Sequence, residues 1–277
     1  ATTIDTKIIH SRPPTDAGLP SRRPRKIMTD DATDGTWVAL FSGGKDSSWA
    51  FYRALEAGLP VSHLLTVHPG EDSYMYHVPE TRLTGLAADV VGIDLVEVEA
   101  GHLAAPEATD AGAQGDREIA PLERALRRLM TEEKIAGVTA GAVESEYQTS
   151  RIKALCDRLG IDLFAPLYGE DPEELGRAMV DAGFEIRILS VAAGGLDESW
   201  LWRRLDHEAL DNLVALNDRY GVHPLGEGGE FETLVVAGPH MDGRLVVEYE
   251  TEWAGDRGRV RVTDASIQSS SGATSRE

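Results

Sequence analysis

Six consecutive residues near the amino end combine the groups that bind phosphate. An apolar run at residues 37–41 precedes them and a helical pattern at residues 48–55 follows, so a strand, a glycine turn and a helix are predicted. Glycines let the backbone approach an anion closely, and the first N–H groups of a helix favour negative charge. A lysine adds a positive charge and two serines add hydroxyl donors. The six residues are Ser42, Gly43, Gly44, Lys45, Asp46 and Ser47.

This segment is not the Gly-x-x-x-x-Gly-Lys-Ser/Thr loop of kinases and GTPases. Ala39 stands where that pattern has its first glycine, and Asp46 stands where it has Ser or Thr. The segment instead resembles the Ser-Gly-Gly-x-Asp-Ser loop of the PP-loop ATP pyrophosphatases. That resemblance implies ATP as co-substrate, cleaved between its α and β phosphates.

Two further motifs follow predicted strands, and ligands of open parallel sheets bind at that end of the strands. Residues 73–77 (Ser-Tyr-Met-Tyr-His) are compatible with an ordinary loop or with a cover over a nucleotide. Residues 144–151 begin a helix that Ser145 is placed to cap. Tyr147, Gln148 and Arg151 share its first turn, which is compatible with a solvated helix or with an anion site.

The last motif, residues 226–233 (Gly-Glu-Gly-Gly-Glu-Phe-Glu-Thr), places three carboxylates on a glycine turn. Such carboxylates can hold Mg²⁺, directly or through water, or they can hold a cationic substrate or ammonia. The motif is also compatible with an acidic turn in an acidic protein.

Together the four motifs resemble the diphthine–ammonia ligase family, whose recurring strings occur here in the same order from about residue 37 to residue 239. The resemblance implies that diphthine on elongation factor 2 reacts with ATP and ammonia through an acyl-adenylate, giving diphthamide, AMP and pyrophosphate. It implies catalytic roles for Lys45, Asp46 and Arg151. The nucleotide contacts it implies are Ser42, Gly43, Gly44, Lys45, Asp46, Ser47 and His77, with Asp46 also a ligand of Mg²⁺. The substrate contacts it implies are Tyr147, Gln148, Arg151, Glu227, Gly228, Gly229, Glu230 and Glu232.

Composition narrows the function classes. The net charge of −20 leaves little room for the basic face of a nucleic-acid binder, so no nucleic-acid partner is expected. After residue 27 the only lysines are Lys45, Lys134 and Lys153, a pattern that resembles proteins of extreme halophiles. The single cysteine, Cys156, excludes an internal disulfide, and no apolar run is long enough for a membrane span. A cytoplasmic protein is expected, and its oligomeric state is left open.

Strands and helices alternate through residue 191, which predicts an α/β fold with a parallel sheet. We predict a disordered tail at 1–35, a PP-loop ATP-binding domain at 36–167, a smaller α+β substrate-binding domain at 168–265 and a disordered tail at 266–277. Predicted strands are 37–41, 61–67, 95–98, 138–143, 163–167, 184–191, 233–237, 244–253 and 259–262. Predicted helices are 48–55, 80–91, 119–133, 147–159, 172–182 and 200–220.

Two other functions remain compatible with the sequence. One is a PP-loop enzyme that adenylates a tRNA base, against which the acidic composition and the single cysteine weigh. The other is a non-catalytic adenine-nucleotide sensor, against which the complete set of loop side chains weighs. Release of pyrophosphate would separate the sensor from either enzyme.

Overall fold

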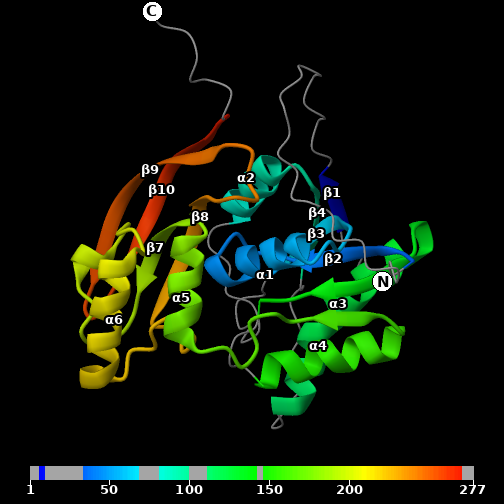
Figure 1. Cartoon of the computed structure of the whole chain (residues 1–277), viewed down its shortest axis with the longest axis horizontal. Coiled ribbons are helices and arrows are strands. Elements are labelled where there is room, and N and C mark those ends of the chain that lie inside the picture. Colours follow the sequence, from blue (N-terminus) through cyan, green and yellow to red (C-terminus); the bar gives the residue numbers. More distant parts are fainter. Residues whose placement is uncertain (1–5, 10–33, 69–80, 100–110, 142–145, 270–277) are drawn as a thin grey trace, which may run out of the picture.

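A computed structural model of the chain describes residues 6–9, 34–68, 81–99, 111–141 and 146–269. The first sheet has the order β1-β4-β3-β2-β5-β6, in which β2 to β6 are parallel and β1 is antiparallel to β4 (Figure 1). Its strands are β1 (Thr6–Ile9), β2 (Thr36–Leu40), β3 (Val61–His68), β4 (Asp94–Glu99), β5 (Ile135–Thr139) and β6 (Asp162–Phe164). The helices that follow these strands are α1 (Lys45–Glu56), α2 (Thr81–Val91), α3 (Ala111–Glu132) and α4 (Glu146–Leu159).

The second sheet is antiparallel throughout, with the order β8-β7-β10-β9. Its strands are β7 (Glu185–Val191), β8 (Phe231–Ala237), β9 (Arg244–Ala254) and β10 (Arg257–Gln268). Helices α5 (Pro172–Asp181) and α6 (His207–Tyr220) pack against each other beside this sheet, and a short 3₁₀ turn, η1 (Glu198–Trp200), lies between β7 and α6. The predicted fold class, a parallel α/β unit followed by a smaller α+β unit, is therefore confirmed.

Two hydrophobic cores hold these sheets. One lies between the first sheet and helices α3 and α4, around Val38, Leu126 and Leu155. The other begins under α1 and α2 and continues without a break into the second sheet, through Phe51, Phe184 and Leu234. Because this second core belongs to both sheets, the two units are packed against each other rather than joined only by the chain.

Several predicted boundaries were wrong, each for a local reason. β1 lies inside the predicted tail at 1–35, where its β-branched residues add an edge strand. β10 runs to Gln268, into the predicted tail at 266–277, because every residue of its end is paired with β9. The predicted helix at 200–220 begins only at His207, since the Asp206 side chain accepts a hydrogen bond from the Ala209 backbone N–H and caps it there.

Other elements differ in length or register. α3 starts eight residues earlier than predicted, β5 spans 135–139 instead of 138–143, and β6 is only three residues long. β5 starts early because Ile135 already pairs with Thr36, at the beginning of β2. No helix among the described residues is long and apolar enough to cross a bilayer.

Candidate active site

The Ser42 loop, residues 42–47, leaves the carboxyl end of β2, the strand that separates β3 from β5 in the first sheet. From β2 the strand order continues through β3 and β4 on one side and through β5 and β6 on the other. Open α/β sheets bind ligands at the carboxyl end of the strands where the order reverses in this way. Gly43 has φ +80°, in the left-handed region that glycine adopts without strain. This glycine turns the chain from the strand into α1.

Ser42 and Ser47 form hydrogen bonds within the loop that fix its shape. Ser47 Oγ accepts a hydrogen bond from the Ser42 backbone N–H at 3.2 Å and donates to the Gly44 carbonyl at 3.1 Å. Ser42 Oγ accepts from the Gly44 backbone N–H at 3.3 Å, and Thr84 of α2 donates its hydroxyl to the Ser42 carbonyl. The N-cap of α1 is Gly44, which has no side chain to occupy the positive end of the helix. An anion can therefore approach that end.

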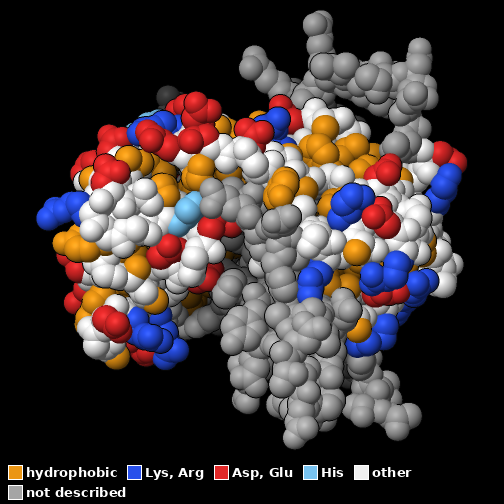
Figure 2. All heavy atoms as spheres, turned by 90° about the horizontal axis from the view of Figure 1, so that it is seen from below, with side chains coloured by type: hydrophobic (Ala, Val, Ile, Leu, Met, Phe, Trp, Pro, Cys, Tyr) orange, Lys and Arg blue, Asp and Glu red, His pale blue; other side chains and the backbone are white. Residues whose placement is uncertain are grey.

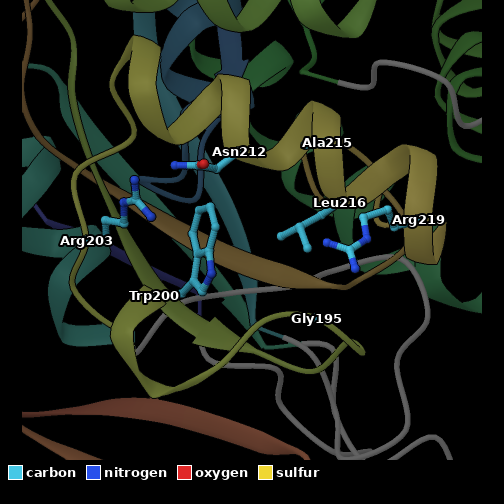
Figure 3. Close-up of a pocket in the computed structure, with 7 residues that line it drawn as sticks. All are labelled: Gly195, Trp200, Arg203, Asn212, Ala215, Leu216 and Arg219. Carbon is cyan, nitrogen blue, oxygen red and sulfur yellow. The ribbon is translucent and has the colours of Figure 1, made fainter.

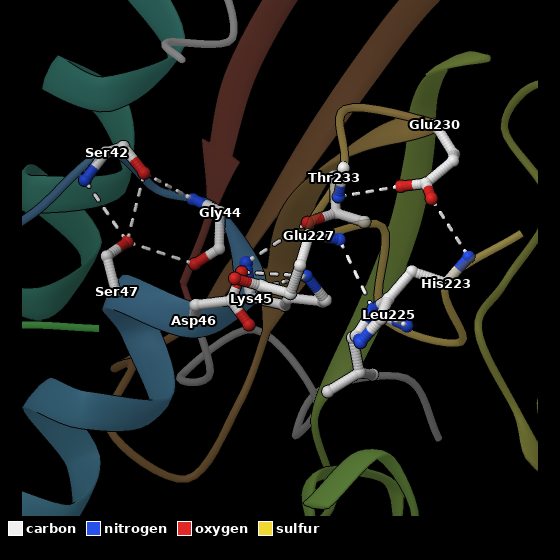
Figure 4. A network of polar contacts seen from close by, with 11 residues as sticks. Ser42, Gly44, Lys45, Asp46, Ser47, His223, Leu225, Glu227, Glu230 and Thr233 are labelled. Carbon is white, nitrogen blue, oxygen red and sulfur yellow. Dashed lines mark hydrogen bonds and ion pairs between the residues drawn. The ribbon is translucent and has the colours of Figure 1, made fainter. Parts of the chain in front are cut away.

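Lys45 is the most buried charged side chain of the loop, only 4% exposed. Its Nζ lies 2.7 Å from Asp46 Oδ2 and 4.0 Å from Glu227 Oε1 (Figure 4). The ring centre of Phe231 is 5.8 Å away. Burial alone would lower the pKa of Lys45, but Asp46, Glu227 and Glu232 outweigh burial and raise that pKa above its ordinary value. Lys45 is therefore a fixed positive charge at neutral pH.

The Glu227 loop, residues 223–232, brings the acidic motif to Lys45 from the second sheet. Glu227 faces the ammonium directly, and the charge of Glu232 reaches it as well. Glu230 points the other way: its Oε1 accepts from the His223 backbone N–H at 3.0 Å and its Oε2 from the Gly228 backbone N–H at 2.8 Å (Figure 4). The three carboxylates therefore divide into two beside the ammonium and one that holds the loop.

His223 is a member of this loop that sequence reasoning missed. Its Nδ1 accepts hydrogen bonds from the backbone N–H groups of Leu225 and Glu227, at 3.1 and 3.3 Å. This acceptor role places the ring proton on Nε2. The available signal was Gly221, a glycine at the end of a predicted helix and two residues before His223, which predicts that the chain turns there.

Two contacts fasten the loops of the two sheets together. The Lys45 backbone N–H donates to Thr233 Oγ1 at 3.2 Å, and the Val235 backbone N–H donates to the Gly43 carbonyl at 2.9 Å. Thr233, buried on β8, was also missed as a site residue. The first turn of α1 is thus held by β8 as well as by its own sheet.

The remaining predicted residues lie outside the contacts described above. His77 and Ser145 fall outside the described residues, and of Tyr147 only the backbone is described, in the first turn of α4. Gln148 and Arg151 are half-buried on α4, which follows β5, the neighbour of β2. The structure therefore brings together the Ser42 loop and the Glu227 loop, and it sets α4 next to the strand from which the Ser42 loop begins.

A cation held beside Lys45 could take ligands from a bound nucleotide and from water as well as from the described side chains. Among the described residues no group of three or more His, Cys, Asp or Glu side chains is arranged to bind a metal ion. Asp46 Oδ1, however, is buried and has no hydrogen-bond partner in the described part of the chain. That oxygen fits one ligand position of a cation whose other ligands come from phosphate groups and water.

Comparison with known proteins gives the same assignment for both parts of the chain. Residues 35–163 match the family model described as the diphthamide synthase N-terminal domain, and residues 171–267 match the diphthamide synthase C-terminal domain. A human protein named diphthine–ammonia ligase is 31% identical over 221 residues, which cover 76% of this chain and 82% of the human one. The rat protein of that name is 32% identical over 220 residues, with the same two coverages.

Other matches span less of the matched protein or resemble this chain less. The fission yeast (Schizosaccharomyces pombe) diphthine–ammonia ligase is 32% identical over 216 residues, and the match spans only 36% of that relative. A solved structure titled as a predicted subunit of tRNA methyltransferase from Methanocaldococcus jannaschii has a TM-score of 0.39 and 20% identity. That alignment covers 74% of this chain and 97% of the other, and so weak a likeness carries no argument.

Proposed function

The chain belongs to the diphthamide synthase family, and we propose that it is the ATP-dependent ligase that amidates diphthine on elongation factor 2 with ammonia. The observation that carries this proposal is the buried Lys45, which lies where the Ser42 loop and the Glu227 loop meet. One loop suits the phosphates of ATP and the other carries carboxylates. A cationic substrate and a nucleotide can therefore meet at this junction.

Activation of the carboxylate is the first chemical step. A carboxylate resists ammonia because its leaving group would be oxide. A carboxylate oxygen of diphthine attacks the α-phosphorus of ATP, the bond between that phosphorus and the bridging oxygen to the β-phosphate breaks, and pyrophosphate leaves. Lys45 and the amino end of α1 oppose the negative charge that gathers on pyrophosphate.

Amide formation is the second step. The lone pair of ammonia attacks the acyl carbon of the adenylate, the carbon–oxygen bond to AMP breaks, and the nitrogen loses a proton. We assign Arg151 to the activated carboxylate or the α-phosphate, on the strength of its family motif and its place on α4. His77, Tyr147 and Gln148 keep the nucleotide and substrate contacts that the family resemblance implies.

The trimethylammonium group of diphthine needs negative or aromatic neighbours. Glu227 and Glu232 fit that role because both act on the charge of Lys45. When the phosphates of ATP pair with Lys45 instead, these two carboxylates become available to a cationic substrate. Glu230 is assigned instead to shaping the loop, since both of its oxygens already accept backbone hydrogen bonds. Gly228 and Gly229 complete the same turn. We assign Mg²⁺, which would neutralise phosphate charge, to the nucleotide and Asp46 Oδ1.

Incubation with diphthine-bearing elongation factor 2, ATP and ammonium tests the proposal. The factor is expected to lose one hydroxyl and gain one amino group by mass spectrometry, with one AMP and one pyrophosphate formed for each amide. Omission of ammonium should stop the mass change. Formation of ADP and orthophosphate, or a factor of unchanged mass, would contradict the assignment.

A further inference from the structure

A pocket of about 300 Å³ lies between α6 and the segment that joins β7 to α6, and it shares no residue with the site described above (Figure 3). Resting on the proposed function, we propose that this pocket binds a single carboxylate side chain of the protein substrate. The pocket is lined by Gly195, Trp200, Arg203, Asn212, Ala215, Leu216 and Arg219.

Arg203 is held rigidly at one side of the pocket. Its guanidinium carbon lies 4.5 Å from the ring centre of Trp200, which is itself only 5% exposed. Its backbone is tied to β7, because its carbonyl accepts a hydrogen bond from the Ile188 backbone N–H at 3.1 Å. A guanidinium stacked on an aromatic face keeps its edge donors available, and that edge matches the two oxygens of a carboxylate.

No acidic residue is among the described residues that line the pocket, and the carboxylate beside it leaves this positive charge available. The nearest partner of Arg203 is Glu208, at 3.6 Å and with a side chain 84% exposed, so that ion pair is weak and easily exchanged. Arg219 lies over the ring of Tyr220 and has no ion pair among the residues that the structure describes. In Figure 3 the Trp200 ring stands between Arg203 and Arg219, with the Asn212 amide nearby. Two guanidinium groups therefore face one cavity in a chain whose net charge is −20.

The two chain segments that form the pocket continue into the candidate active site. Its wall on α6 ends at Tyr220, and the chain then enters the Glu227 loop, where the His223 backbone N–H donates to Glu230. Its opposite wall starts at Ala192, whose backbone N–H donates to the Glu230 carbonyl at 2.8 Å. Both walls thus lead into the Glu227 loop, and we take the protein that presents its modified side chain to Lys45 to reach the pocket as well.

A carboxylate of a protein fits this surface better than a nucleic acid does. Phosphate backbones are bound by many cations spread along a surface. Acidic side chains are abundant on the half of the molecule that carries the second sheet (Figure 2), so that half would repel an extended polyanion. Two arginines in one cavity suit a single carboxylate. Such contacts act at hydrogen-bond distance, so they persist at salt concentrations that suppress long-range attraction.

Charge reversal at Arg219 tests the proposal. Arg219→Glu should raise the KM for diphthine-bearing factor roughly 10-fold or more, because a charge-assisted contact becomes a repulsion, with kcat at saturating factor and the affinity for ATP unchanged. Arg203→Gln should shift KM in the same direction. The matched control is Arg124→Glu, an exposed arginine on α3 for which no ion pair is found in the described part of the chain and which should change none of the three quantities.

The factor is also titrated directly against the protein and the Arg219→Glu variant in the absence of ATP and ammonium, so that docking is read separately from the reaction. Weaker binding by the variant supports the pocket even if the factor is never amidated. Equal KM and equal binding for Arg219→Glu and Arg124→Glu would overturn the pocket proposal alone. An Arg219→Glu variant that loses affinity for tRNA instead of the factor would also overturn it alone, whereas a wild-type protein that does not bind the factor would contradict the proposed function as well.

Discussion

Lys45 illustrates how one residue depends on both parts of the chain. A buried ammonium is costly unless carboxylates and hydrogen bonds compensate for the lost water. Asp46 comes from the same helix turn, whereas Glu227 and Glu232 come from the second sheet. The buried ammonium is therefore stable only when the two sheets are packed together. A polyphosphate that binds there competes with the carboxylates that already neutralise Lys45.

Replacing Lys45 by methionine keeps the length of the side chain and removes its charge. AMP formation should fall by about 100-fold or more, because the departing pyrophosphate loses a cation aimed at it. Single-turnover assays with labelled ATP measure this rate. Lys153→Met is the matched control, since Lys153 is exposed on α4 and pairs only with Asp157 among the described residues. Normal AMP formation in the Lys45→Met variant, with the melting temperature preserved, would remove Lys45 from the phosphate site.

At the scale of the element, the amino end of α1 is held on two sides. β8 contributes Thr233 and Val235, and the turn after β5 contributes Gly141. A Cβ on Gly141 would lie 2.5 Å from the carbonyl carbon of Asp46 and 2.7 Å from the backbone nitrogen of Ser47. These atoms are backbone, so a side chain at Gly141 has to displace the Ser42 loop.

The variant Gly141→Ala should therefore raise the KM for ATP and lower stability by about 1–3 kcal/mol, as overpacking usually does. Gly85→Ala is the control: Gly85 is within α2, and a Cβ there meets nothing within 4 Å. That change should not alter the KM for ATP and should stabilise the protein by about 0.5–1 kcal/mol. Thermal unfolding with and without ATP measures both effects. Indistinguishable behaviour of the two variants would show that the contact at Gly141 does not position the loop.

Elements whose sequence pattern is local could be predicted in both units. The apolar strand at residues 61–67 and the helix at 172–182 are written in neighbouring residues, and both were found nearly in place. Long-range pairing was not accessible, which is why β1 and the end of β10 were assigned to tails. The bond from Lys45 to Thr233 joins residues 188 apart, and no periodicity reveals it.

The carboxylates of the Glu227 loop show the same limit within the site. Sequence alone gives three glutamates on one turn and cannot say which of them faces the ligand. The direction of Glu230 is set by backbone N–H groups that face into the turn, at His223 and Gly228. A carboxylate that satisfies backbone donors and one that faces an ammonium have identical sequence signals.

At the scale of the whole molecule, the shared core places a titratable ring between the two sheets. His240, after β8, stacks on Phe184 at 4.9 Å between ring centres and meets the edge of Phe51 of α1 at 5.8 Å. Burial lowers the pKa of His240 from 6.5 to about 4. Between these pH values His240 is therefore protonated in the unfolded chain and neutral in the folded chain.

Stability should accordingly fall as the pH drops from about 6.5 to about 4, and His240 should contribute on the order of 3 kcal/mol to that loss. Well above pH 6.5 the ring is neutral in both states and contributes nothing to the pH dependence. His240→Phe keeps the ring contacts and removes the titration, so its melting temperature should decline less on acidification, by roughly 5–10 °C. Parallel curves for the two proteins between pH 7 and pH 4 would contradict a buried neutral ring.

The net charge of −20 acts on the molecule as a whole. At low salt the excess carboxylates repel one another in the compact state, whereas at about 1 M salt the screening length is only about 3 Å. We therefore expect the melting temperature to rise markedly from about 0.1 M to about 2 M KCl. Sucrose, which stabilises without screening charge, is the control and should not reproduce the rise at low salt.

Cys156 gives an independent measure of the same effect. It is the only cysteine in the chain, it is 1% exposed, and burial raises the pKa of its thiol to about 12. A thiol reagent at neutral pH should therefore react only with molecules that have opened. Its rate of reaction should fall as KCl is added and stay high in sucrose. A protein that keeps Cys156 protected and its melting temperature constant at low salt would show that its carboxylates are already compensated by the ion pairs of the fold.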